Sequence, residues 1–133
     1  MGNILPHFNV DLAGTFLVPQ SLMDAREKYR NNQLTAAELH AIENNEIKSL
    51  VEKLKSYGLK VVTDGNFRYD SYLAGFMCSL DGIELDASKK KFQLTHRIDT
   101  LRRHPVVDDF MFLTGITGGD VIAKQVLPAP SLV

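Results

Sequence analysis

The stretch TAAELHAIENNEIKSLVEKLKSYGLKVVTDG, residues 35–65, decides the fold class. Thr35 and Glu38 have the spacing of a capping box, in which each side chain accepts a hydrogen bond from the other residue's backbone amide. Behind this box, apolar residues recur every three or four positions, and Gly58 suits a left-handed helix end. The pattern predicts a helix over roughly 35–57. The apolar run that follows it predicts a strand, and a helix leading into a strand is typical of parallel α/β sheets.

Further elements are expected on both sides of this unit, from apolar runs, helical spacing and turn residues. The sequence predicts a buried strand over 8–18, a helix from Pro19 to Asn31-Asn32, a strand over 59–65, a helix-like segment over 69–80, a turn at Asp81-Gly82, a strand over 89–98, a helix from His104-Pro105 to Leu113 and a strand over 121–127. Helices and strands therefore alternate along most of the chain.

Composition describes an ordinary globular domain. The chain has 133 residues and a net charge of −1, from 15 lysines and arginines against 16 aspartates and glutamates. This balance argues against a nucleic-acid partner, which would need a positive excess. A single cysteine, Cys78, cannot form an internal disulfide, and no apolar run reaches the ~18 residues of a membrane span. We expect one domain over 1–133, soluble and cytoplasmic, with no membrane partner.

Polar side chains follow the predicted strands at their exits. Ligands gather at the carboxyl ends of parallel strands, and the exits lie at Gly14-Thr15, at Thr63–Asn66 and at Pro128–Ser131. The second exit carries Asp64, Asn66 and Arg68, which could hold an amino or carboxylate group. Taken alone, each exit is more often a plain turn than a site, because Asp-Gly is a common turn signal.

Other polar residues show no metal-binding pattern. The histidines lack the close spacing of a metal site; they are His7, His40, His96 and His104. Residues 89–104 carry six basic residues against one aspartate, a local charge of +5. This stretch fits a solvated hairpin edge protected by lysines, and the alternative is a site for an anion.

The run GLKVVTDGNFR, residues 58–68, resembles GLxxVTDGEFRR of the cobalamin-independent methionine synthase family, most closely in its short single-barrel members. Further matches follow the family in order along the chain; they are Gly14–Pro19, Leu80–Glu84, His104–Leu113 and Leu127–Ser131. The resemblance therefore spans about residues 11–131.

The resemblance implies a (β/α)8 TIM barrel that transfers a methyl group from a folate to the thiol of homocysteine, in methionine biosynthesis. Such a barrel needs about 250 residues. The chain would supply a partial barrel, roughly its first three β/α units, with the long capped helix and an inserted hairpin. Zinc and methyl-folate are implied for the complete enzyme. The family's zinc ligands lie beyond this chain, so we expect it to hold no cofactor or metal.

The resemblance also implies substrate-binding positions at Thr15, Asp64, Asn66 and Arg68. Thr15 keeps the hydroxyl of a family serine, whereas Asn66 replaces the glutamate that pairs with the substrate ammonium. Other polar positions of the family are apolar here; they are Leu12, Val18 and Leu73. Loss of a charge at an ionic contact weakens binding about 10- to 100-fold, so homocysteine is expected to bind weakly.

Two functions stay open at this point. The first is a truncated methionine synthase-like domain that is inactive alone and needs a complementing C-terminal chain. The alternative is a non-catalytic, oligomerising domain that binds a small amino acid or an anion. Three strands of a barrel leave two unpaired edges, so a homo-oligomer is also expected.

Overall fold

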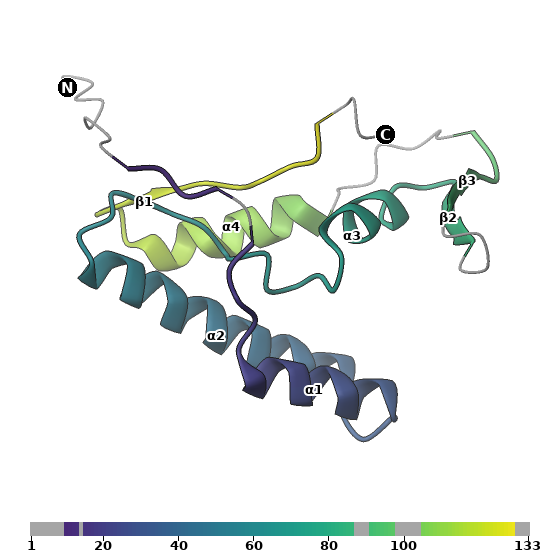
Figure 1. The fold of residues 1–133 in the computed structure, drawn as a ribbon, viewed down its shortest axis with the longest axis horizontal. Helices are drawn as coiled ribbons and strands as arrows, with labels where there is room; N and C mark the ends of the chain where they lie inside the picture. Colours follow the sequence, from purple (N-terminus) through teal and green to yellow (C-terminus); the bar gives the residue numbers. More distant parts are fainter. Residues whose placement is uncertain (1–9, 14, 87–90, 98–104, 130–133) are drawn as a thin grey trace.

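The computed structural model describes residues 10–13, 15–86, 91–97 and 105–129 (Figure 1). Its elements are α1 (Gln20–Arg30), α2 (Ala36–Ser56), β1 (Val61–Val62), α3 (Tyr72–Cys78), β2 (Ile83–Asp86), β3 (Lys91–Leu94), α4 (Pro105–Thr117) and β4 (Ile122–Ala123). This mixture of helices and short strands confirms the α/β class. No helix among the described residues is long and apolar enough to cross a membrane.

The long helix α2 begins and ends where its sequence predicts. The Thr35 hydroxyl accepts a hydrogen bond from the Glu38 amide at 3.3 Å, and the Glu38 carboxylate accepts one from the Thr35 amide at 2.8 Å. These bonds satisfy amides that a helix start leaves without partners. At the other end Gly58 has a φ of +77°, a conformation that glycine adopts without steric cost.

A two-stranded parallel sheet joins distant parts of the chain. β1 pairs with β4 in the register Val61↔Ile122 and Val62↔Ala123. The backbone amide of Lys124 extends the pairing by donating to the carbonyl of Val62 at 2.8 Å. The predicted strands over 59–65 and 121–127 are therefore neighbours, although each is shorter than predicted.

The predicted strand over 8–18 is not present as a strand in its described residues, 10–13 and 15–18. The segment is held at isolated points instead. The Phe16 amide donates to the Gly65 carbonyl at 3.3 Å, and Lys124 Nζ reaches the Leu12 carbonyl at 2.7 Å. A strand requires a ladder of backbone bonds, and these single contacts do not form one.

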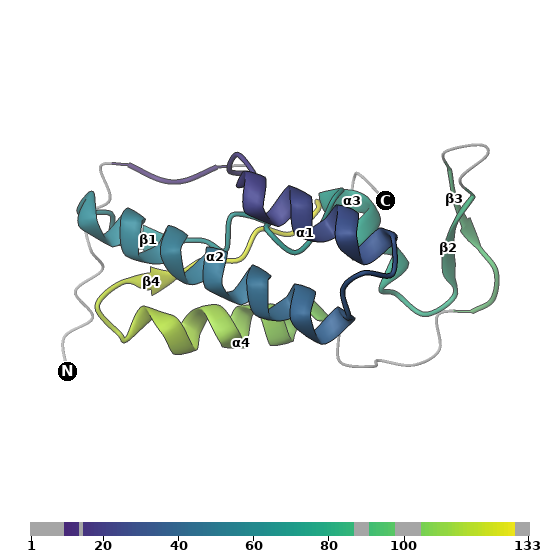
Figure 2. The same cartoon turned by 90° about the horizontal axis from the view of Figure 1, so that it is seen from below.

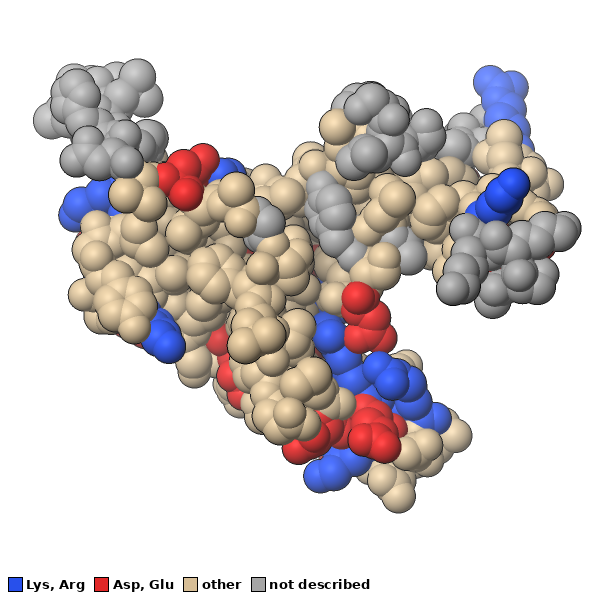
Figure 3. All heavy atoms as spheres, viewed as in Figure 1, with Lys and Arg blue, Asp and Glu red and all other residues tan. Residues whose placement is uncertain are grey.

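An antiparallel hairpin of β2 and β3 lies away from the rest of the fold (Figures 1 and 2), in the register Ile83↔Leu94 to Asp86↔Lys91. The turn expected at Asp81-Gly82 is present directly before β2, and the expected hairpin is present as well. Basic side chains stand out at this end of the molecule (Figure 3). The predicted strand over 89–98 lies partly outside the described residues.

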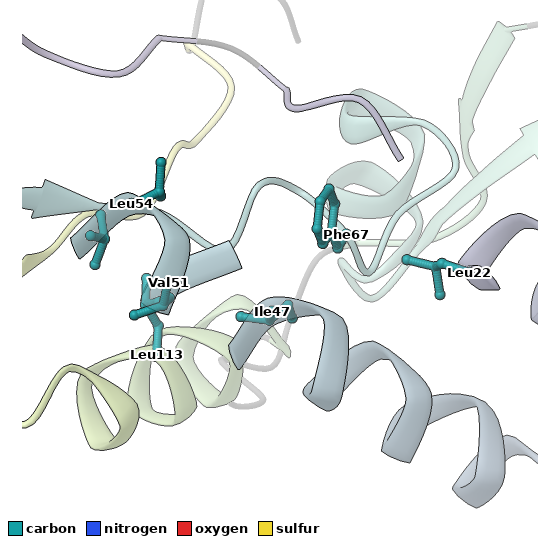
Figure 4. Close-up of a cluster of buried hydrophobic side chains, with 7 residues drawn as sticks. Leu22, Ile47, Val51, Leu54, Phe67 and Leu113 are labelled. Atoms are coloured by element: carbon teal, nitrogen blue, oxygen red, sulfur yellow. The ribbon is translucent and has the colours of Figure 1, made fainter. Parts of the chain in front are cut away.

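The core lies where α2 packs between α1 and α4 (Figure 2). Buried side chains from these helices meet β1 and the loop after it (Figure 4); they are Leu22, Ile47, Val51, Leu54, Val62, Phe67 and Leu113. The apolar stripe of α2 supplies three of them. Helix packing on this stripe fixes the loop that follows β1, where the candidate site lies.

Candidate functional site

The loop after β1 brings three of the predicted site residues together. The Asn66 side-chain amide donates to the Thr15 hydroxyl at 3.1 Å, across 51 positions of sequence. The Asn66 backbone amide donates to Asp64 Oδ1 at 3.0 Å, and Asp64 is 1% exposed. Asn66 has a φ of +58°, a left-handed conformation that asparagine tolerates better than most residues. Thr15, Asp64 and Asn66 therefore form one polar group at the strand exit, in which Asp64 and Asn66 are buried and Thr15 is exposed.

Gln125 completes this group and was missed in the sequence. Its side-chain amide donates to Asp64 Oδ2 at 3.3 Å, and its Oε1 is buried without a hydrogen-bond partner. The register explains the contact: Val62 is paired with Ala123, so two residues further along each strand Asp64 lies beside Gln125. Only the register of β4 against β1 identifies Gln125 as a neighbour of Asp64, and the sequence does not specify that register.

Arg68 does not join this group. Its side chain is 6% exposed and lies between α2 and α4, with Nε 2.8 Å from Asp109 Oδ1 and Nη1 3.5 Å from Glu43 Oε2. Nη2 donates to Asn44 Oδ1 at 2.7 Å, and the guanidinium lies 5.0 Å from the centre of the Phe112 ring. The charge of Arg68 is thus already neutralised by protein carboxylates, and the side chain connects the loop to two helices.

Burial changes the acidity of the groups around Arg68. Burial raises the pKa of Asp109 above its ordinary value, against the opposing effects of the Tyr69 hydrogen bond and the Arg68 charge. Burial likewise raises the pKa of Glu43, opposed by the Arg68 charge. Tyr69 donates its hydroxyl to Asp109 Oδ2 at 2.8 Å, and burial followed by this bond raises the pKa of Tyr69. The cluster is therefore structural rather than solvent-facing.

Sequence reasoning also missed Glu43 and Asp109. Glu43 had a usable signal, because it lies four residues from both Leu39 and Ile47 on the apolar stripe of α2. A carboxylate at such a position is buried and needs a partner. Asp109 had no comparable signal, since it follows Asp108 near the start of α4, where acidic residues are also explained by the helix dipole.

The space beside the strand exit is small. A cavity of about 10 Å³ borders Asn66, Tyr69 and Gln125, with apolar walls from α3, α4 and the segment after β4. This is about the room of one water molecule. An amino acid would fit there only if these walls moved.

The described residues do not form a metal centre. No group of three or more histidine, cysteine, aspartate or glutamate side chains in the described ranges is arranged to hold a metal ion. Cys78 is exposed, and His40 contacts Glu43 and Arg68. His7, His104 and much of the basic stretch over 89–104 lie outside the described residues.

Three bacterial proteins are similar to this chain. A solved structure from Listeria monocytogenes, named "Putative Vitamin-B12 Independent Methionine Synthase", is 41% identical over 94% of this chain, with a TM-score of 0.81. The chain is similar in sequence and fold to part of that protein. It covers 37% of the Listeria chain.

Two uncharacterized proteins of Bacillus subtilis are also similar. YxjG is 34% identical over 96% of this chain, and YxjH is 33% identical over 94% of it. The chain spans 36% of each, so it corresponds to about a third of the length of all three relatives. No family model matches the chain.

Proposed function

We propose that the chain is a methionine synthase-like domain, the N-terminal part of a (β/α)8 barrel from the cobalamin-independent family. The observation that carries this proposal is the 41% identity and TM-score of 0.81 to the Listeria protein over nearly the whole chain. The parallel pairing of β1 with β4 across a connection that ends in α4 supports it, because such crossovers build these barrels. The domain is assigned to the cytoplasm, which suits a lone unpaired cysteine.

In this proposal the strand exits hold the amino-acid part of homocysteine. The side chains of Thr15 and Asn66 come from two different exits and are joined by a hydrogen bond of 3.1 Å, and the Asn66 backbone amide donates to Asp64 Oδ1 at 3.0 Å. Arg68 holds the loop in place through α2 and α4 instead of contacting the substrate. The methyl transfer itself needs the remaining β/α units, so the domain is inactive alone.

Zinc is the metal of the complete family enzyme, where it would activate the substrate thiol. The described residues do not fit a zinc site, because tight sites need three or four ligands and no such cluster is present among them. No step through zinc is therefore assigned to this chain.

A second candidate is a non-catalytic domain. The observation that favours it is the Asn66–Thr15 bond, which joins two neutral side chains where the family has a carboxylate for the substrate ammonium. The cavity of about 10 Å³ beside Asn66 also favours this candidate, because it is too small for an amino acid. In this case the domain retains the fold of the family but no longer binds an amino acid.

Homocysteine binding tests the role assigned to position 66. We expect the wild type to bind homocysteine at millimolar concentration or not at all, and Asn66→Glu to bind it about 10- to 100-fold more tightly, because the new carboxylate pairs with the ammonium group. Isothermal titration calorimetry measures both constants. Asn66→Gln, which has the same length without the charge, is the matched control and should show no gain.

Two outcomes would contradict the assignment of this position. One is micromolar binding by the wild type, which would mean that a neutral residue suffices. The other is an Asn66→Glu variant that keeps its circular dichroism spectrum but gains no affinity.

Metal content provides an independent check. The purified chain should carry well under one equivalent of zinc after dialysis against a weak chelator, since scattered histidines and one cysteine cannot supply a tight site. Atomic emission spectrometry measures the ratio directly. A stoichiometric ion would show that the chain holds ligands which the sequence and the described residues do not reveal.

A further inference from the structure

The side-chain amide of Gln125 has a hydrogen-bond partner on one side only. Its Nε2 group donates to Asp64 Oδ2, whereas its Oε1 atom is buried and receives no hydrogen bond from the described residues. The carboxylate fixes this orientation, because an ionised carboxylate accepts hydrogen bonds and cannot donate one to Oε1. A buried acceptor without a donor is costly and is rare in native proteins. Oε1 therefore indicates that a further donor binds beside it.

The cavity beside Gln125 suits a small donor. Asn66, Tyr69 and Gln125 border it, and its volume of about 10 Å³ is the room of one water molecule. An ammonium group has a similar size. The remaining walls are apolar side chains of α3, α4 and the segment after β4, which offer no donor of their own. The cavity therefore admits one small polar group rather than a whole amino acid.

Negative charge lies close to this cavity. Asp64 is buried, and in the part of the chain that the structure describes its oxygens accept hydrogen bonds from neutral amides and pair with no cationic side chain. Arg68 is shared by Glu43 and Asp109, so it does not neutralise Asp64. Because a buried carboxylate without a cation is costly, this region favours a donor that carries positive charge over water.

The contacts of these groups are made within this chain. Asp64, Asn66 and the Oε1 atom of Gln125 are all buried by its own residues, so they do not form part of an open surface that another segment could cover. Asn66 is also bonded to Thr15 at the neighbouring strand exit. A ligand whose ammonium group enters the cavity would therefore have its remaining atoms at the strand exits.

We propose that Gln125 Oε1 and the cavity beside it form the subsite for the ammonium group of a small amine or amino acid, with Asp64 supplying the negative charge. Gln125 is then a specificity-determining residue, because its oxygen requires an N–H donor from the ligand. The inference deepens the proposed function, on which it rests, by identifying a residue that receives the ammonium group although position 66 is neutral.

Methylammonium chloride tests the subsite in the wild-type chain. Two-dimensional NMR should show saturable shifts of the Asn66 and Gln125 side-chain amides, with a dissociation constant of roughly 10–100 mM, since a ligand of two heavy atoms binds no more tightly. Methanol has a similar size without the charge, and tetramethylammonium has the charge without an N–H donor. At equal ionic strength each should bind about tenfold more weakly or not at all.

Two variants remove the subsite by different routes. Gln125→Met keeps a similar volume and loses the acceptor oxygen. Asp64→Asn removes the charge, and its new amide can donate to Gln125 Oε1 once the glutamine amide turns over. Each should weaken methylammonium binding about tenfold or more. Gln93→Met is the matched control, because Gln93 donates to Asp86 at 3.0 Å on the hairpin, and it should leave binding unchanged.

Homocysteine titrated into the same samples separates this inference from the proposed function. If methylammonium binds as expected but homocysteine binds neither the wild type nor Asn66→Glu, the proposed function fails and the subsite stands. If homocysteine binds the wild type, Gln125→Met and Asp64→Asn equally well, the subsite is wrong and the proposed function stands. The subsite is also wrong if the wild type shows no saturable methylammonium shifts, if tetramethylammonium binds as well, or if both variants are folded by circular dichroism and bind unchanged.

Discussion

Replacing Arg68 by methionine should lower the free energy of unfolding by about 3–5 kcal/mol, the usual cost of removing one partner from a buried ion pair. The substitution leaves Glu43 and Asp109 buried without their guanidinium, although each lies within 3.5 Å of it in the wild type. It also removes the bond to Asn44 that fastens the loop to α2. Urea denaturation at neutral pH measures the loss. Arg30→Met is the control, since that side chain is 64% exposed and should cost less than about 1 kcal/mol.

The deficit of Arg68→Met should shrink as the pH falls. Burial raises the pKa of both Glu43 and Asp109, so the native state binds these protons more tightly than the unfolded chain. Such groups contribute stability at low pH and lose that contribution as the pH rises through their raised pKa values. Without the Arg68 charge, which lowers both pKa values, the free energy of unfolding should fall more steeply with rising pH. The difference from the wild type should therefore be smaller at mildly acidic pH than at pH 8, and a constant difference would argue against ionised carboxylates at this cluster.

Truncating Leu113 to alanine should cost about 2–5 kcal/mol, from lost apolar burial and the cavity left behind. Leu113 is fully buried and belongs to the core that α4 shares with α2 and β1. The shift of the urea midpoint at constant slope gives the loss. Met111→Ala on the same helix is the matched control, because Met111 is exposed and a surface change costs about 0.5 kcal/mol or less. A loss below 1 kcal/mol for Leu113→Ala would mean that α4 does not pack as described.

The elements that sequence patterns predicted well are those stabilised by neighbours along the chain. The bonds of Thr35 with Glu38 join residues three positions apart, and the left-handed end at Gly58 needs only one residue. The apolar stripe of α2 likewise repeats within one helical turn. The prediction of a strand over 8–18 was wrong for its described residues, because a strand is stabilised by a partner that is distant in sequence. Apolar residues and a glycine permit a strand, but whether a ladder forms depends on a partner that lies elsewhere in the sequence.

The candidate site shows the same division. The rule that ligands gather at strand exits, together with the family resemblance, predicted that Thr15 and Asn66 belong together, and they are in hydrogen-bond contact. Neither source placed Gln125 beside Asp64, because that contact depends on the register of β4 against β1. Neither showed that Arg68 turns away from the exit toward α2 and α4.

The amino-acid sequence by itself determined where α1 and α2 begin and end, the α/β class and the polar character of the loop after β1. The helix predicted to end at Leu113 continues to Thr117 in α4. Only the tertiary structure decided which of those polar groups face one another and which are neutralised. Arg68 illustrates the reason, since its carboxylate partners lie 25 and 41 positions away, on Glu43 and Asp109. Local hydrogen bonds and side-chain periodicity act within a few residues, whereas the burial of a charge and the choice of its partner depend on elements that meet only when the chain has folded.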